Sequence, residues 1–176
     1  MTSLTNPLVW LLRFRHRRGY GVHSPFAFRF ITDVIYEPLP FYAYQTLATL
    51  LPFKQKFRKK KGLELMLRLA NYQQPNVIAI QGEAPLPTAY LHAGCRKAAV
   101  LSLDQCSEAQ LVYLTEPNEK AISLLAQGGG MLVVDNLHHH RQWFKQLPAT
   151  LHFDLYDIGI ALFALPYHPQ YYVVNF

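Results

Sequence analysis

The hydrophobic residues in the first 75 positions recur at the spacing of helices. After Ser24 and Pro25, apolar side chains return every three or four residues, at Phe26, Phe30, Ile31 and Val34. This spacing places them on one face of a helix. A serine followed by proline is a typical helix start, and Pro38 and Pro40 predict where the helix ends. Similar patterns predict further helices over residues 42–51 and around residues 63–70.

From residue 76 onward, short apolar runs alternate with helical segments. The runs predict strands at residues 77–80, 98–103, 111–114, 131–134, 153–165 and 171–176. Helices are predicted between them, at residues 88–94, 119–126 and 138–147. Continuous apolar runs are typical of strands buried on both faces, and their alternation with helices predicts a doubly wound, mainly parallel α/β sheet.

One connection in this pattern is too short for an ordinary crossover. Only residues 104–110 separate the second predicted strand from the third. A parallel crossover with its helix usually needs at least about ten to twelve residues. The link is therefore either an extended strap across the sheet or the turn of an antiparallel hairpin.

The composition limits the architecture to one core of ordinary size. The chain has 176 residues, of which 51% are hydrophobic and 16% charged, and this excludes a disordered protein. We predict one structural unit, in which a helical segment at residues 1–75 packs on an α/β domain at residues 76–176.

The net charge of +6 is concentrated in the front half of the chain. One cluster contains Arg13, Arg15, Arg17 and Arg18, and a second contains Lys54, Lys56, Arg58, Lys59, Lys60 and Lys61. Such clusters indicate either an anionic partner, such as nucleic acid or a lipid surface, or simply solvated faces of helices and linkers.

The cysteines and the N-terminus predict a cytoplasmic location. Cys95 and Cys106 have no metal-ligand or redox spacing, which is typical of a reducing compartment. The apolar run at residues 7–12 is too short for a signal peptide or a membrane span.

Several segments, in order, resemble a family of class I S-adenosylmethionine-dependent methyltransferases of Bacteroidetes-type bacteria. GYGVHSPFAFRFI at residues 19–31 resembles the N-terminal signature of that family, and PFYAY (40–44) and LMLRLANYQQP (65–75) resemble its leading helices. VVDNLH (133–138), FDLYDIGIALF (153–163) and QYYVVNF (170–176) are similar to its later strands. The resemblance implies a Rossmann-like methyltransferase sheet, here reduced to about six strands, mostly parallel with the last antiparallel, and an N-terminal helical extension.

The chain departs from this family at the cofactor turn. The family has an acidic residue and a glycine-rich turn after its first strand, and this chain has Ala79, Gln81 and Pro85 at those positions. Prolines remove backbone donors, and a glutamine brings a Cβ where the cofactor needs room. The resemblance leaves Gly82 in the turn and Asp104 at the ribose position as the cofactor-binding candidates. The helix, strand and helix that follow in the family and wall the adenine are missing.

The family pattern also implies a weak metal site. Catechol-type methyltransferases hold a divalent cation with an aspartate and a later Asp-Asn pair. Asp135 and Asn136 match the pair, but Thr115 replaces the first aspartate, and Glu116 is the alternative carboxylate. So few oxygen ligands make a poor site for a hard cation.

Two histidine motifs complete the catalytic candidates, which are Asp135, His138 and His23. His138, His139 and His140 are consecutive, so their side chains point about 100° apart on a helix and do not converge on one ion. His23 precedes Ser24, and the pair is read either as a base beside a nucleophile or as a helix cap, with His23 lining a substrate cleft.

Three functional hypotheses follow. The first is a degenerate methyltransferase-like protein that binds no cofactor and acts as a binding or interaction module, pairing with itself or a related chain. The second is an active S-adenosylmethionine-dependent O-methyltransferase with an atypical cofactor loop. The third is a basic adaptor for nucleic acid.

Overall fold

The computed structural model describes residues 19–51 and 56–176, together with their side chains except at residues 56–59. The helical segment contains α2 (Pro25–Phe30), a π-helical turn η3 (Ile31–Ile35), α3 (Ala43–Ala48) and α4 (Lys56–Gln73). Ser24 caps α2, because its hydroxyl oxygen accepts a hydrogen bond from the Ala27 amide at 3.3 Å. The predicted helix start is therefore confirmed.

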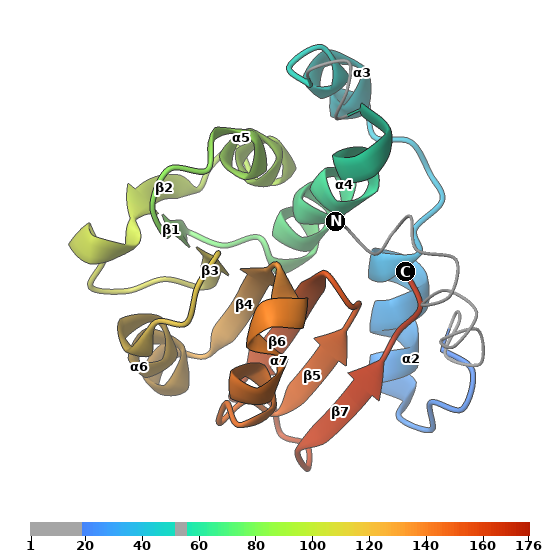
Figure 1. Ribbon diagram of the computed structural model, residues 1–176, viewed down its shortest axis with the longest axis vertical. Coiled ribbons are helices and arrows are strands. Elements are labelled where there is room, and N and C mark those ends of the chain that lie inside the picture. Colours follow the sequence, from blue (N-terminus) through green and yellow to red (C-terminus); the bar gives the residue numbers. More distant parts are fainter. Residues whose placement is uncertain (1–18, 52–55) are drawn as a thin grey trace.

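The rest of the chain alternates strands and helices around one sheet. The strands are β1 (Val77–Ile80), β2 (Ala99–Ser102), β3 (Leu111–Leu114), β4 (Gly130–Asp135), β5 (Leu151–Asp154), β6 (Ile158–Phe163) and β7 (Gln170–Val173). The helices are α5 (Pro85–Gly94), α6 (Glu119–Gly128) and α7 (Leu137–Lys145), with a 3-10 turn η5 (Leu103–Gln105). The seven strands lie in the order β2-β1-β3-β4-β6-β5-β7, between edges at β2 and β7 (Figure 1). The prediction of an α/β fold with a mainly parallel sheet is confirmed.

Two details of the predicted sheet are wrong. The run at residues 153–165 is a hairpin of β5 and β6, so the sheet has seven strands instead of six. The antiparallel strand is β6, whereas the last strand, β7, lies parallel to β5. The chain reverses between β5 and β6 and again before β7, and β7 pairs with β5 instead of the strand that precedes it in sequence.

The hairpin turn between β5 and β6, at residues 155–157, contains no glycine or proline, the residues that usually indicate a turn in a sequence. Tyr156 occupies the turn with a φ of 79°, a left-handed conformation that is uncommon for an aromatic residue. The carboxylate of Asp154 accepts a hydrogen bond from the Tyr156 amide at 2.8 Å, and the Leu155 amide bonds to the Ile158 carbonyl at 2.9 Å. A side-chain acceptor thus stabilises a turn that composition did not predict.

The short link between β2 and β3 is an extended strap. Both strands run parallel to β1 and lie on opposite sides of it, so residues 103–110 must pass over β1. Leu103, Cys106 and Ala109 point inward from the strap and join the core formed with α6 and α7. Of the two alternatives for this link, the strap is correct.

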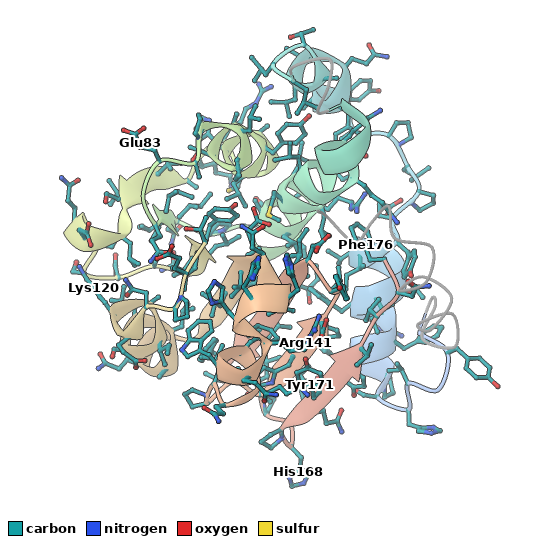
Figure 2. All side chains as sticks on the ribbon, in the orientation of Figure 1. Glu83, Lys120, Arg141, His168, Tyr171 and Phe176 are labelled. Atoms are coloured by element: carbon teal, nitrogen blue, oxygen red, sulfur yellow. The ribbon has the colours of Figure 1, made fainter. Side chains whose placement is uncertain are left out.

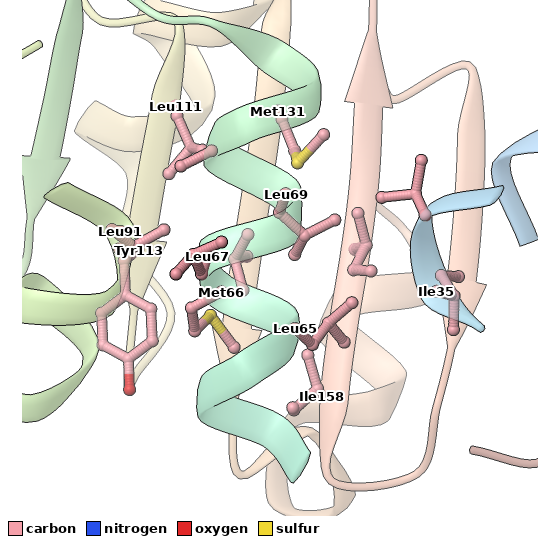
Figure 3. Close-up of a cluster of buried hydrophobic side chains, with 14 of the residues drawn as sticks. Ile35, Leu65, Met66, Leu67, Leu69, Leu91, Leu111, Tyr113, Met131 and Ile158 are labelled. Atoms are coloured by element: carbon pink, nitrogen blue, oxygen red, sulfur yellow. The ribbon is translucent and has the colours of Figure 1, made fainter. Parts of the chain in front are cut away.

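The sheet is covered on both faces. The helical segment and α5 pack on one face, and α6, α7 and the strap pack on the other. In the first layer α4 is central, and Figure 3 shows its Leu65, Met66, Leu67 and Leu69 beside buried side chains of the strands, among them Leu111, Tyr113 and Met131. The N-terminal helices and the sheet therefore share one core. Among the described helices, none combines the length and the apolar character needed to cross a membrane.

Candidate functional site at the carboxyl edge of the sheet

The order of the strands locates a candidate site between β1 and β3. From β1 the chain moves to β2 on one side and then to β3 on the other, so the direction of winding reverses at this boundary. Open α/β sheets bind ligands in the crevice outside the carboxyl ends of such strands. The residues at this point are Gln81 and Gly82 after β1, and Thr115 and Glu116 after β3.

The side chain of Gln81 bridges this crevice. Its Oε1 accepts hydrogen bonds from the backbone amides of Thr115 and Glu116, both at 3.0 Å, and lies 3.5 Å from the Thr115 hydroxyl. The amide of Gln81 extends the ladder by donating to the Tyr113 carbonyl at 3.0 Å. This boundary between β1 and β3, where the winding reverses, is the switch point of the sheet. Two backbone donors at the switch point are therefore already hydrogen-bonded within the protein.

The first turn of α5 offers few donors to an anion. Pro85 and Pro87 are its first and third residues, so only Leu86 among these three carries an N–H group. The next amide, that of Thr88, is bonded within the helix to the Ala84 carbonyl at 2.9 Å. The predicted helix began at residue 88, so the structure places both prolines inside α5 and not in the turn before it. Glu83, just before α5, adds a negative charge beside this turn. In Figure 2 it lies at the opposite end of the molecule from His168, which is on the loop before β7.

Gly82 and Asp104 lie at the ends of neighbouring parallel strands, as the candidate cofactor contacts require. Gly82 follows β1 with a φ of 63°, and the space around it is open. Asp104 is exposed in η5 after β2, and its backbone carbonyl accepts a hydrogen bond from Nζ of Lys120 at 2.8 Å. The fold thus brings both residues to the carboxyl edge.

Asp135 lies at the end of β4 and is already hydrogen-bonded through both oxygens. Oδ2 accepts the hydroxyl of Tyr113 at 2.9 Å, and Oδ1 accepts the amide of Asn136 at 2.9 Å. Burial raises the pKa of Tyr113 far above its usual value, and the Asp135 carboxylate raises it further. Tyr113 therefore remains a proton donor to Asp135. Asn136 is exposed and left-handed, with a φ of 53°.

His138 lies in the first turn of α7 and faces the β5–β6 turn. Its Nδ1 is 3.2 Å from Oδ1 of Asp157, without the alignment of a hydrogen bond. Its ring stacks on Tyr156 with centroids 5.9 Å apart. Burial lowers the pKa of His138, and His139 lowers it further, whereas Asp157 opposes both effects. The imidazole is neutral at pH 7. Asp157 was not a candidate from sequence, because only the unpredicted turn brings it to α7.

The remaining metal and catalytic candidates do not assemble into a centre. Glu116 is exposed, and among residues 19–51 and 56–176 no three His, Cys, Asp or Glu side chains form a group that would hold a metal ion. His23 is exposed before α2, and the adjacent Ser24 lies beside residues 166–170, where β6 ends and β7 begins. That is the opposite edge of the sheet from Asp135, so the fold does not bring these two catalytic candidates together.

Of the two basic clusters, the structure describes only the side chains at the end of the second, Lys60 and Lys61. Arg13, Arg15, Arg17 and Arg18 lie outside the described residues, as do the side chains at residues 54–59. Lys60 pairs with Glu64 at 3.6 Å, and Nζ of Lys61 lies 4.1 Å from the ring centroid of Phe176. The two described lysines therefore have contacts within the protein.

No protein-family model matches this chain, and no curated protein matches it.

Proposed function

We propose that the chain is a binding module built on a methyltransferase-like sheet, and that it does not bind S-adenosylmethionine. The observation that carries this proposal is the bridge from Gln81 to the amides of Thr115 and Glu116. A cofactor at the switch point needs backbone donors and open space there. In this chain an internal acceptor uses those donors, and a side chain lies across the crevice.

The start of α5 supports the same proposal. Helix N-termini bind anionic groups through their free N–H groups and the helix dipole. Pro85 and Pro87 leave Leu86 as the one donor among the first three residues, and Glu83 adds a like charge for a carboxylate or phosphate ligand. The charged end of a cofactor would therefore be held weakly.

The adenine side is also poorly enclosed. Small-molecule sites bury most of the ligand between apolar walls. Within the described chain β2 is the edge strand on this side, and Leu101 on it is 40% exposed. The strap that follows β2 buries its apolar side chains Leu103, Cys106 and Ala109 in the core, so these side chains are not available to enclose an adenine beside Asp104.

Titration of the purified chain with S-adenosylmethionine tests the proposal. A ligand that binds only the folded state at a hundred times its Kd stabilises it by about 2.7 kcal/mol. We expect no heat of binding in calorimetry and no shift of Tm. A saturable Tm shift that disappears in Asp104→Ala would contradict the proposal and favour an active methyltransferase.

We further propose that the partner of this module is a second copy of the chain, bound through an aromatic surface on the helical face. This surface comprises Phe26, Tyr72 and Tyr167, around the buried ring of Phe30. Tyr72 and Tyr167 are 43% and 46% exposed, and large exposed aromatic side chains are typical of interfaces.

Sedimentation velocity over a range of concentrations tests the second copy as partner. We expect a concentration-dependent dimer that Tyr72→Ser combined with Tyr167→Ser dissociates. The matched control is Tyr42→Ser, which removes an exposed tyrosine elsewhere and leaves the dimer intact. A monomer at all concentrations would contradict self-pairing.

A further inference from the structure

A hollow among the N-terminal helices carries a second site, independent of the carboxyl edge. It lies between the loop at residues 37–40, α3 and α4, and its volume is about 440 Å³. Small-molecule sites usually have volumes of roughly 300–1,000 Å³. The side chains on which the inference rests are Tyr44, Arg68, Glu37 and Glu64, with apolar wall from Pro38 and Leu39.

Arg68 is a buried cation without a carboxylate partner. Its side chain lines the hollow although the residue is only 7% exposed. One guanidinium nitrogen donates to the Ile35 carbonyl at 3.0 Å, and Nε has no hydrogen-bond partner. None of the ion pairs among the described residues includes Arg68, and Glu64, one turn before it on α4, pairs with Lys60. Buried charges in proteins are normally paired, so this guanidinium lacks the anion that its burial demands.

Tyr44 lines the same hollow and adds a hydroxyl. It donates to the Glu64 carbonyl at 3.3 Å, which is long for a hydroxyl donor. Burial raises the pKa of Tyr44, and the neighbouring Arg68 lowers it by a smaller effect. The hydroxyl therefore keeps its proton at neutral pH, and its side-chain hydrogen bond with Arg68 places the two groups side by side.

The other charges in the hollow define the class of anion. Three other charged residues line the hollow, namely Glu37, Glu64 and Lys60. Lys60 is paired with Glu64 at 3.6 Å, so Glu37, which acts electrostatically on Tyr44, is the carboxylate left to oppose a second negative charge on a ligand. A single carboxylate suits the planar fork of a guanidinium, which binds it through two parallel hydrogen bonds. The apolar side chains of Pro38 and Leu39 provide contact for an organic remainder.

We propose that this hollow binds a small organic acid with one carboxylate, held by the Arg68 guanidinium and the Tyr44 hydroxyl. The proposal does not depend on whether the carboxyl edge binds a cofactor. It assigns the loop at residues 37–40 and α3 to ligand binding as well as to packing.

Arginine side-chain NMR of the full ¹⁵N-labelled chain tests this directly. The Nε–H signal of Arg68 reports on a buried group with no partner in the free protein. Sodium benzoate is the probe, with sodium chloride at equal ionic strength as the control and inorganic phosphate as the dianion. We expect a saturable shift of the Arg68 signal with benzoate, no such shift with chloride, and at least about tenfold weaker binding of phosphate, a difference of about 1.4 kcal/mol. Absence of a saturable shift with benzoate, or phosphate binding as tightly as benzoate, would overturn the proposal.

Variants measured by calorimetry with benzoate assign the contacts. Arg68→Lys keeps the charge and loses the fork, so we expect at least about tenfold weaker binding, whereas Arg96→Lys, the same change at an exposed arginine, leaves binding unchanged. If Arg68→Lys does not fold, Tyr44→Phe is the second variant. It keeps the aromatic ring and loses the hydroxyl, so we expect several-fold weaker binding of benzoate. Unchanged affinity in Tyr44→Phe, or in a folded Arg68→Lys, would contradict the assigned contacts.

Discussion

Arg141 on α7 donates from Nε to the Oδ2 oxygen of Asp154 at the end of β5, across 2.8 Å. The Asp154 side chain is 2% exposed. The Tyr171 hydroxyl donates to the same oxygen at 2.7 Å, and the Tyr156 amide donates to Oδ1 at 2.8 Å. One buried carboxylate thus connects α7, the hairpin turn and β7.

Arg141→Met should destabilise the fold strongly. The substitution keeps much of the side-chain volume but leaves the Asp154 carboxylate buried without its cation, which costs about 3–5 kcal/mol. Urea unfolding followed by circular dichroism measures this loss. The matched control is Lys60→Met, which breaks the more exposed pair with Glu64 and should cost about 0–1 kcal/mol. Equal effects of the two variants would contradict the importance of the buried pair.

Gly94→Ala should separate two packed helices. A Cβ at Gly94, the last residue of α5, would lie 2.2 Å from the backbone carbonyl oxygen of Leu67 on α4. Neither helix backbone can move aside locally, so we expect a loss of about 1–3 kcal/mol or more in the free energy of unfolding.

Gly128→Ala is the control for this prediction. Gly128 ends α6, and a Cβ there meets no atom within 4 Å. Alanine also restricts the unfolded chain more than glycine does, so this variant should be neutral or more stable by up to about 1 kcal/mol. Both changes are read from the midpoints of urea unfolding. A Gly94→Ala variant as stable as the wild type would show that α4 and α5 pack less closely.

Stability should fall as the pH drops below neutrality, because of buried His152. Burial lowers the pKa of this histidine in the folded chain, against a smaller opposing effect of the Gln170 and Leu147 carbonyls. In the unfolded chain its pKa returns to about 6.5. Below that pH the unfolded state binds a proton that the folded state does not, so the free energy of unfolding declines as the pH falls from about 6.5.

Urea unfolding at pH 7.5, 6.5 and 5.5 measures this decline, and His152→Gln should make it shallower. His138 contributes in the same direction, since its pKa is also lowered, so part of the decline remains in the single variant. An identical pH dependence in His152→Gln would exclude this histidine as its source.

The double variant Gln81→Gly, Pro85→Gly should not gain S-adenosylmethionine binding. The two substitutions open the turn after β1, but they add no residues between Asp104 and Gln110 that would enclose the adenine. It should also lose about 1–3 kcal/mol of stability, because the amides of Thr115 and Glu116 lose their acceptor. Calorimetry and urea unfolding measure the two effects. Micromolar binding by this variant would show that the turn alone prevents binding in the wild type.

Features that depend on neighbours in sequence were predictable from the sequence alone. The periodicity of apolar residues predicted the α/β class, and the Ser24-Pro25 pair predicted the cap of α2, because each is decided by a few consecutive residues. The short link after β2 likewise predicted that an ordinary crossover helix is absent there, because chain length alone limits what a connection can contain.

Features that depend on distant partners were decided by the tertiary structure. The turn at Tyr156 needs the Asp154 carboxylate, and that carboxylate is held by Arg141 and Tyr171 from two other elements. The direction of β7 follows from its pairing with β5. The role of Gln81 as a bridge across the crevice follows from its hydrogen bonds to backbone amides 34 and 35 residues later in the sequence. A hydrogen bond depends on distance in space, and the sequence specifies such distances only through the complete packing of the core.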